Sequence, residues 1–173
     1  MSFDLASYNR LGQAFVACNQ AGQTVTLIDT STTTGFVLSN PWGSGKKLVL
    51  MQAAFAYTTV PVARAIVFLA MSIAPSAVAH ATTTAETIYG ADGSGSAGRS
   101  AARVYNASTT PNLPVYSRVI GYSPTTPATA AALTQTEYIG GALILVPGSY
   151  IQTSYITTAP VGVTSMMWVE VPV

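Results

Sequence analysis

The C-terminal part of the chain alternates apolar runs with turn signals, and this pattern constrains the fold more than any other feature. Residues 141–146 form an unbroken apolar run, and Pro147-Gly148, which follows it, is a strong turn signal. Residues 149–157 and 163–171 then place side chains alternately on two faces, with the period of two that a β-strand has. Short strands joined by tight turns predict antiparallel β structure in this region.

Strand signals of the same kind recur upstream, where β-branched and aromatic residues cluster. Residues 46–57 are largely apolar on both faces, which is typical of a strand that packs on two sides. Further strands are expected over 24–28, 35–39, 64–73, 103–105 and 115–122. Short strands separated by Gly/Pro turns predict an all-β fold, an antiparallel β-sandwich of jelly-roll type.

The chain has the length of one domain, because 173 residues suit a single hydrophobic core and no repeat or linker divides them. We assign residues 21–173 to one β jelly-roll domain, with a Gly/Ser/Thr-rich loop region at about 74–127. One helical turn is expected over 128–133. Residues 1–20 are expected to form an N-terminal arm outside the sandwich.

Charged residues are scarce, at 8% of the chain, and the formal net charge is +1. An average soluble domain is nearer ~25% charged. The composition is too apolar for disorder and lacks the Lys/Arg surplus that phosphate neutralisation needs, so we expect no nucleic-acid partner. Two explanations of the low charge are open, a surface of neutral polar side chains and a surface covered by neighbouring subunits. We expect both to contribute.

Residues that could carry catalysis or bind a metal are few: one His, one Cys and six carboxylates. The segment 43–47 lacks the first glycine and the final Ser or Thr of a phosphate-binding loop. The glycine-rich stretch 90–98 is interpreted as a surface loop, and His80 as a polar loop residue without metal-ligand spacing. We therefore expect no enzyme activity, no metal and no cofactor. The remaining catalytic alternative is a glycosidase pair drawn from Glu86, Asp92, Glu137 and Glu170.

The sequence contains no targeting or membrane signal that we recognise. The early Asp4 and the lack of a basic stretch before an apolar run argue against a secretory signal. Cys18 has no second cysteine to pair with and is interpreted as a small core residue. The apolar run 65–73 is about half the ~20 residues that a membrane span needs, so no membrane partner is expected.

Four large side chains lie on the two final predicted strands: Tyr150, Tyr155, Met167 and Trp168. We interpret them as core or subunit-interface residues, because aromatic side chains bury a large area at modest entropic cost. The alternative interpretation is a carbohydrate-binding platform formed by the aromatic members of this group.

Three segments resemble the trimeric jelly-roll virion proteins of tailed bacteriophages, both head-decoration (cement) proteins and fibre knobs. They are IGGALILVPGSY at 139–150, MWVEVP at 167–172 and GFVLSNPWGSGKKLVL at 35–50. The resemblance implies a homotrimer on the virion surface, present in the host cytoplasm during assembly, with the major capsid protein as its partner. It implies no catalytic residue and no cofactor.

Within this interpretation the N-terminal arm is the candidate for capsid contact, through Phe3, Leu5, Tyr8 and Arg10. The leading alternative is a receptor- or glycan-binding knob of a tail or head fibre, which would use the loops 90–98 and 111–127 with tyrosines such as Tyr116 or Tyr122. A hydrolase with the same fold is the third alternative.

Overall fold

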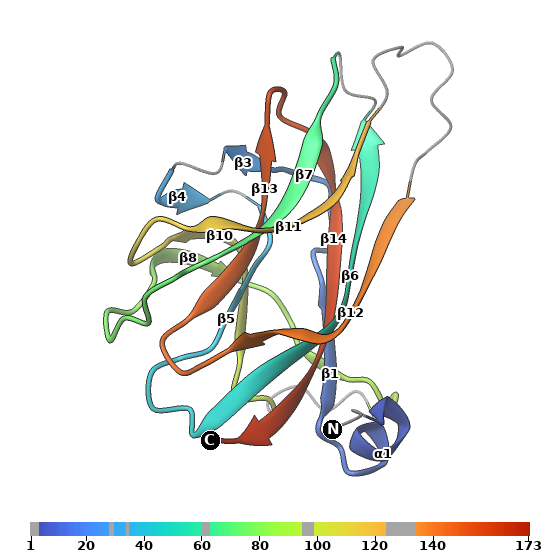
Figure 1. The fold of residues 1–173 in the computed structure, drawn as a ribbon, viewed down its shortest axis with the longest axis vertical. Helices are drawn as coiled ribbons and strands as arrows, with labels where there is room; N and C mark the ends of the chain where they lie inside the picture. The colour runs from blue at the N-terminus through green and yellow to red at the C-terminus, as the bar shows by residue number, and fades with distance from the viewer. Residues whose placement is uncertain (1–3, 28–29, 34, 60–62, 95–98, 124–133) are drawn as a thin grey trace.

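The computed structural model is an all-β protein in which two sheets pack face to face, with the short helix α1 near the N-terminus (Figure 1). It describes residues 4–27, 30–33, 35–59, 63–94, 99–123 and 134–173. The predicted antiparallel β-sandwich is confirmed. In chain order the elements are α1 (Leu5–Arg10), β1 (Ala14–Cys18), β2 (Gln23–Thr24), β3 (Thr26–Leu27), β4 (Thr32–Thr33), β5 (Val37–Ser39), β6 (Lys46–Thr59), β7 (Ile66–Met71), β8 (Ala81–Ala85), β9 (Tyr89–Gly90), β10 (Arg103–Thr109), β11 (Val115–Tyr122), β12 (Thr134–Leu145), β13 (Tyr150–Ile156) and β14 (Val161–Pro172).

The first sheet, sheet A, has 6 strands in the order β12-β6-β14-β1-β9, with β2 paired to β14. Strand β14 is its centre and pairs with β6 along its whole length, from Val161 opposite Thr59 to Pro172 opposite Lys46. The register shifts near the midpoint of both the β6–β14 and the β6–β12 pairs. In β12 the shift falls at Gly140 and Gly141, whose φ angles of 59° and 87° favour glycine.

The second sheet, sheet B, has 8 strands, of which six follow the order β11-β7-β13-β5-β10-β4. The short strand β3 pairs with β13 in parallel, whereas β8 pairs antiparallel with β10. Leu38, Val104 and Ile151 lie opposite one another in β5, β10 and β13, and all three point into the core. The next residues along these strands therefore point to the outer face of sheet B.

The core lies between the two sheets and is built from the inward-facing residue of each strand pair. Strand β14 illustrates the alternation: Met166 and Trp168 are buried in the core, whereas Met167 points to the other face. The largest fully buried members of this core cluster are Phe36, Leu38, Leu48, Leu50, Phe55, Leu69, Leu145, Ile151, Met166 and Trp168. Burial of these apolar side chains, at about 1.5–3 kcal/mol each, is the main term that stabilises the sandwich.

Helix α1 packs on part of the outer face of sheet A. The Asp4 carboxylate caps the helix by accepting a hydrogen bond from the Ala6 amide. Leu5 and Tyr8, three positions apart, lie on the same side of the helix and pack on the sheet. The sheet residues of this second cluster are fully buried: Ala14, Val49, Met51 and Val169.

Two predictions about the organisation of the chain need correction. The predicted N-terminal arm outside the sandwich is wrong for residues 14–18, which form strand β1 of sheet A, where Phe15 and Ala17 enter the core. The region 74–127 holds more strand than expected: β10 and β11 lie where strands were predicted at 103–105 and 115–122, and β8 and β9 are additional. The helical turn expected over 128–133 lies outside the described residues.

Candidate functional site

Tyr150, one of the residues singled out from the sequence, is buried on the outer face of sheet B. Its side chain is 0% exposed, and its hydroxyl donates to the Asn112 carbonyl oxygen. Burial raises the pKa of the Tyr150 hydroxyl to about 12, so that it remains a proton donor at neutral pH. Tyr150 packs within the chain, and the interpretation that makes it part of a surface carbohydrate platform is wrong for this residue.

Trp168 is also 0% exposed, on the inner face of sheet A, where its ring lies 6.2 Å from that of Phe15. Its indole nitrogen donates to Glu170 Oε1 at 3.4 Å. Glu170 is itself buried and accepts further hydrogen bonds from the Ser100 hydroxyl at 2.5 Å and the Ala101 amide at 3.0 Å. These hydrogen bonds connect the segment before β10 to β14, so Trp168 and Glu170 stabilise the packing of the sandwich.

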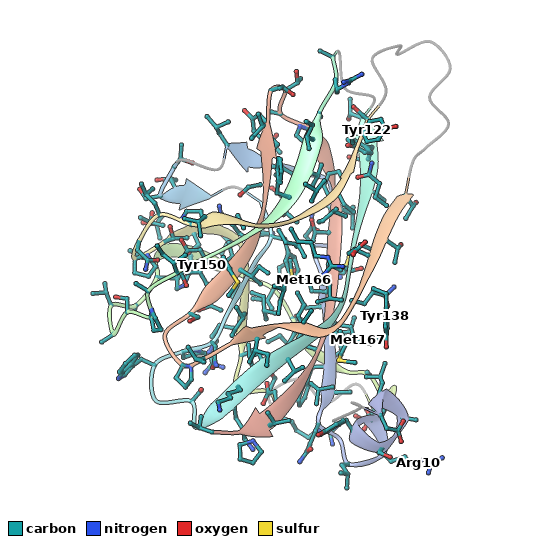
Figure 2. All side chains as sticks on the ribbon, in the orientation of Figure 1. Arg10, Tyr122, Tyr138, Tyr150, Met166 and Met167 are labelled. Atoms are coloured by element: carbon teal, nitrogen blue, oxygen red, sulfur yellow. The ribbon has the colours of Figure 1, made fainter. Side chains whose placement is uncertain are left out.

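Tyr155 and Met167 lie on different sheets and do not meet. Tyr155 of β13 is half-buried and packs against the core cluster. Met167 of β14 is half-buried on the outer face of sheet A (Figure 2). The four residues predicted as core or interface therefore do not assemble into one surface, and Met167 is the member that faces outward on sheet A.

The candidate capsid-contact residues differ in their exposure. Leu5 and Tyr8 pack against sheet A, so they are not fully available to a partner. Arg10 is exposed in the last turn of α1, and Figure 2 shows it pointing away from the body of the protein. Phe3 lies outside the described residues.

Away from helix α1, the part of the outer face of sheet A that faces solvent is built from uncharged residues, whereas Lys47, opposite Val171, lies at the α1 end of this face. Four strands contribute to it in register: Tyr138, Gln52, Met167 and Val16 form one row across β12, β6, β14 and β1. We call this surface the uncovered face; its residues are Val16, Cys18, Gln52, Ala54, Ala56, Tyr89, Thr134, Thr136, Tyr138, Val163, Ser165 and Met167. None of them is fully buried, and Tyr138 is 68% exposed. An uncharged face with an exposed aromatic residue is suited to contact with another protein surface.

A pocket of about 180 Å³ lies on the other side of the molecule, against the outer face of sheet B. It is lined by residues 39–42, 76–80, Tyr105 and Gly148, and we call it the His80 pocket. The His80 ring lies 5.5 Å from the ring of Tyr105 and 5.2 Å from that of Tyr150, measured between centroids.

Both nitrogens of His80 contact serine hydroxyls from neighbouring strands of sheet B. Nε2 lies 3.1 Å from Ser39 Oγ on β5, and Nδ1 lies 2.8 Å from Ser108 Oγ on β10. Burial lowers the pKa of His80 to about 4, so the ring is neutral at pH 7. A neutral imidazole has one donor and one acceptor nitrogen, so it donates to one serine and accepts from the other.

A serine hydroxyl against an imidazole is also the geometry of a nucleophile and its base. A base with a pKa of about 4 removes a proton poorly at neutral pH, because efficient general bases have a pKa near the working pH. Ser39 is buried, and the hydrogen bonds of the His80 ring in the described structure run to serines and to no carboxylate. The Ser39–His80–Ser108 cluster therefore fits an uncharged polar lining of the pocket better than a catalytic pair.

Sequence reasoning treated His80 as a polar loop residue and so missed this pocket. No motif connects Ser39, His80 and Ser108, because they come from three segments far apart in the chain. The one available signal is Trp42, a large apolar residue inside the turn sequence Asn-Pro-Trp-Gly, and it is 61% exposed.

The described residues carry little sign of other kinds of site. This part of the chain contains no group of three or more His, Cys, Asp or Glu that could hold a metal ion. None of its helices is long and apolar enough to cross a membrane. Burial, together with the nearby Glu86, raises the pKa of the Cys18 thiol, so the thiolate is disfavoured.

The fold defines the protein as an antiparallel β-sandwich. Comparison of the chain with protein-family models, with curated proteins and with solved structures gives no match.

Proposed function

We propose that the chain is a non-enzymatic structural protein of a tailed-bacteriophage virion, a jelly-roll subunit that assembles as a homotrimer and decorates the capsid. The observation that carries the proposal is the uncovered face of sheet A, which is neutral across four strands. The 8% charge of the chain and its resemblance to trimeric virion proteins at 35–50, 139–150 and 167–172 point the same way.

The chemistry of the uncovered face favours a second copy of the chain as its occupant. Contact between two neutral surfaces removes no charge from water, so it avoids the desolvation cost that charged faces carry. A stable interface buries about 800 Å² on each partner, which is the scale of one face of a small sheet. Three copies could each turn this face toward a common threefold axis, where head-to-tail contacts close into a ring.

Capsid attachment would then fall to the exposed side of α1 and the residues that follow it. Arg10 is exposed there, and the neighbouring Leu11 is 69% exposed although it is apolar. One such contact is small, but three copies held in a trimer would bind the capsid together, and linkage of weak contacts raises the overall affinity by ~10²–10⁴-fold. Leu5 and Tyr8 would support the helix from below by their packing on sheet A.

The trimer is tested by the mass of the purified protein in solution. We expect a trimer by sedimentation velocity at micromolar concentration and a shift toward monomer for Met167→Lys, which places a charge on the uncovered face. The matched control is Thr84→Lys on the exposed strand β8, which should leave the trimer intact. A monomeric wild-type protein at micromolar concentration would refute the trimer, and a Met167→Lys variant that assembles normally would refute the uncovered face as the trimer interface.

The virion location is tested by electron microscopy of particles labelled with antibodies against this chain. Label distributed over the capsid surface is the expected result, and loss of rebinding by an Arg10→Ala variant to stripped particles would assign the contact to α1. Label confined to fibre tips would instead support the receptor- or glycan-binding knob. Particles without label would overturn both proposals.

A further inference from the structure

The His80 pocket has a rigid frame that does not depend on a ligand. Its three lining segments are tied together by backbone hydrogen bonds: the Gly148 amide donates to the Asn40 carbonyl at 2.8 Å, and the Ser76 amide donates to the Gly148 carbonyl at 3.1 Å. The Asn40 side-chain amide donates to the carbonyls of Lys46 and Leu145 at 2.8 and 2.9 Å. The pocket is therefore preformed, as small-molecule sites usually are.

Glycine at position 148 is required for this frame. Its φ is +86°, and a Cβ atom there would lie 2.5 Å from Cε3 of Trp42 and 2.8 Å from the Ser76 carbonyl oxygen. The Trp42 ring thus lies directly against the backbone of the turn, which holds the indole in place at the pocket although 61% of the side chain is exposed. The Trp42 ring is a large aromatic surface that is fixed in position and exposed beside a cavity, so a ligand with an apolar face can pack on it.

The polar groups in the pocket are all uncharged. No Lys, Arg, Asp or Glu is among its lining residues, and His80 is neutral at pH 7. The Tyr105 hydroxyl has no hydrogen-bond partner within the described ranges, so it is free to donate to a ligand or accept from one. The Ser39 hydroxyl is hydrogen-bonded to His80, and its remaining lone pair is available to accept a further hydrogen bond.

The size and chemistry of the pocket select its ligand. A volume of about 180 Å³ lies below the roughly 300–1,000 Å³ of sites for drug-sized molecules, so one small ring fits and an extended chain does not. A pyranose ring presents an apolar C–H face, which stacks on an indole, and neutral hydroxyls, which pair with phenol and serine oxygens. A charged ligand would find no counter-charge in the pocket.

We propose that the His80 pocket binds a single neutral sugar ring, the terminal unit of a glycan, between the Trp42 indole and the Tyr105 hydroxyl. The site is independent of the assembly proposed above, because it lies on sheet B and the uncovered face lies on sheet A. It is also distinct from the loops 90–98 and 111–127, which the alternative fibre-knob interpretation of the sequence would use.

Two single-residue probes make the test local. The chain has two tryptophans, and Trp168 is fully buried, so a ligand-induced change in tryptophan emission reports on Trp42. The chain has one histidine, so a single imidazole resonance reports on His80. We would titrate purified protein with a panel of neutral methyl glycosides of glucose, galactose, mannose, fucose and the two N-acetylhexosamines, and with glucuronate and sialic acid as charged comparisons.

The expected result is saturable binding of at least one neutral glycoside, with a Kd of about 1 mM. Trp42→Ala should weaken that binding by at least ~tenfold, and Tyr105→Phe should weaken it without loss of the fold. Leu113→Ala, which truncates an exposed apolar residue outside the pocket, is the matched control and should bind normally.

Three results would overturn the proposal: no glycoside moves either signal up to about 100 times the expected Kd, only the charged sugars bind, or Trp42→Ala binds as well as wild type. Because both variants retain the His80 resonance, a folded spectrum separates loss of binding from loss of structure. Failure here would leave the trimer and capsid proposals untouched, since their readouts are mass and particle location.

Discussion

Arg118 of β11 and Glu137 of β12 form an ion pair that joins sheet B to sheet A along one edge of the sandwich. Arg118 Nη2 lies 2.5 Å from Glu137 Oε1, and Nε donates to the same oxygen at 2.8 Å. A second bond crosses the same edge, where Gln135 Nε2 donates to the Tyr122 carbonyl oxygen at 2.6 Å. β11 and β12 end the two sheets, so these contacts close an edge that strand pairing leaves open.

The energy of this ion pair is predicted to be small and sensitive to salt. The two side chains are 37% and 28% exposed, so water screens their attraction. A double-mutant cycle with Arg118→Met and Glu137→Gln should give a coupling free energy of about 0.5–1 kcal/mol at low salt, and less in 0.5 M NaCl. Urea unfolding measures each variant, and a coupling that does not change with salt would contradict an electrostatic origin.

Glu170 is predicted to matter far more to stability. Its carboxylate is buried and receives hydrogen bonds from the backbone amides of Ala101 and Ala102 and from the Ser100 hydroxyl. Glu170→Ala leaves these buried donors without a partner, so we expect a loss of about 2–4 kcal/mol in the free energy of unfolding.

Two comparisons test that explanation. Glu170→Gln retains one acceptor oxygen and should lose less than Glu170→Ala. Glu86→Ala removes a half-buried carboxylate that accepts from the Asn106 side-chain amide, and should cost less than about 1 kcal/mol. Hydrogen exchange should accelerate at the Ala101 and Ala102 amides in the Glu170 variants, and unchanged exchange there would argue against the role assigned to Glu170.

His80 predicts a specific dependence of stability on pH. Its pKa is about 4 in the folded protein and ~6.5 when the chain is unfolded, so the unfolded state takes up a proton first as the pH falls. The stabilising contribution of the neutral ring is complete above pH 6.5 and is lost as the pH drops toward 4. We expect a loss of about 1–2 kcal/mol over this window, because the ring is not fully shielded from water.

The measurement is straightforward because the chain has a single histidine. The imidazole Cε1 proton should titrate with a midpoint near 4, and a midpoint of 6 or above would show that the ring is solvated. The difference in unfolding free energy between wild type and His80→Gln, measured from pH 7 to 4.5, isolates this titration from those of the carboxylates.

Two glycines with similar backbone angles should differ in their tolerance of a side chain. Gly148 has φ +86° and is crowded by Trp42 and Ser76, whereas Gly43 has φ +81° and no heavy atom within 4 Å of the place where a Cβ would lie. Gly148→Ala should therefore cost about 2–4 kcal/mol, the sum of backbone strain and steric overlap. Gly43→Ala should cost only the strain, about 1–2 kcal/mol. Equal costs by thermal unfolding would mean that the turn relaxes around the methyl group.

The strands near the C-terminus were predictable because their signal is local. The alternation in residues 149–157 and 163–171 and the turn at Pro147-Gly148 are set by neighbouring residues, and they appear as β13 and β14. Strand β1 was missed because a stretch of five residues carries too short a pattern to indicate a strand. It becomes a strand by pairing with β14 on one side and β9 on the other. Pairing partners that are distant in sequence supply most of what makes such a segment a strand.

The candidate sites depended on contacts that no sequence pattern encodes. Met167 and Trp168 are adjacent and equally apolar, yet one faces outward on sheet A and the other is sealed in the core, because successive residues of a strand point to opposite faces. Which face is the core follows only from the way the two sheets pack.

By itself, the sequence determined the fold class, most strands of the sandwich and the shortage of charge, because composition and a period of two are local properties. Only the tertiary structure decided that α1 packs on one part of the outer face of sheet A, and that His80 lies between Ser39 and Ser108 in a pocket that Trp42 also lines. Both arrangements arise from residues far apart in the chain, which meet when non-local strand pairing and the burial of apolar faces bring them together.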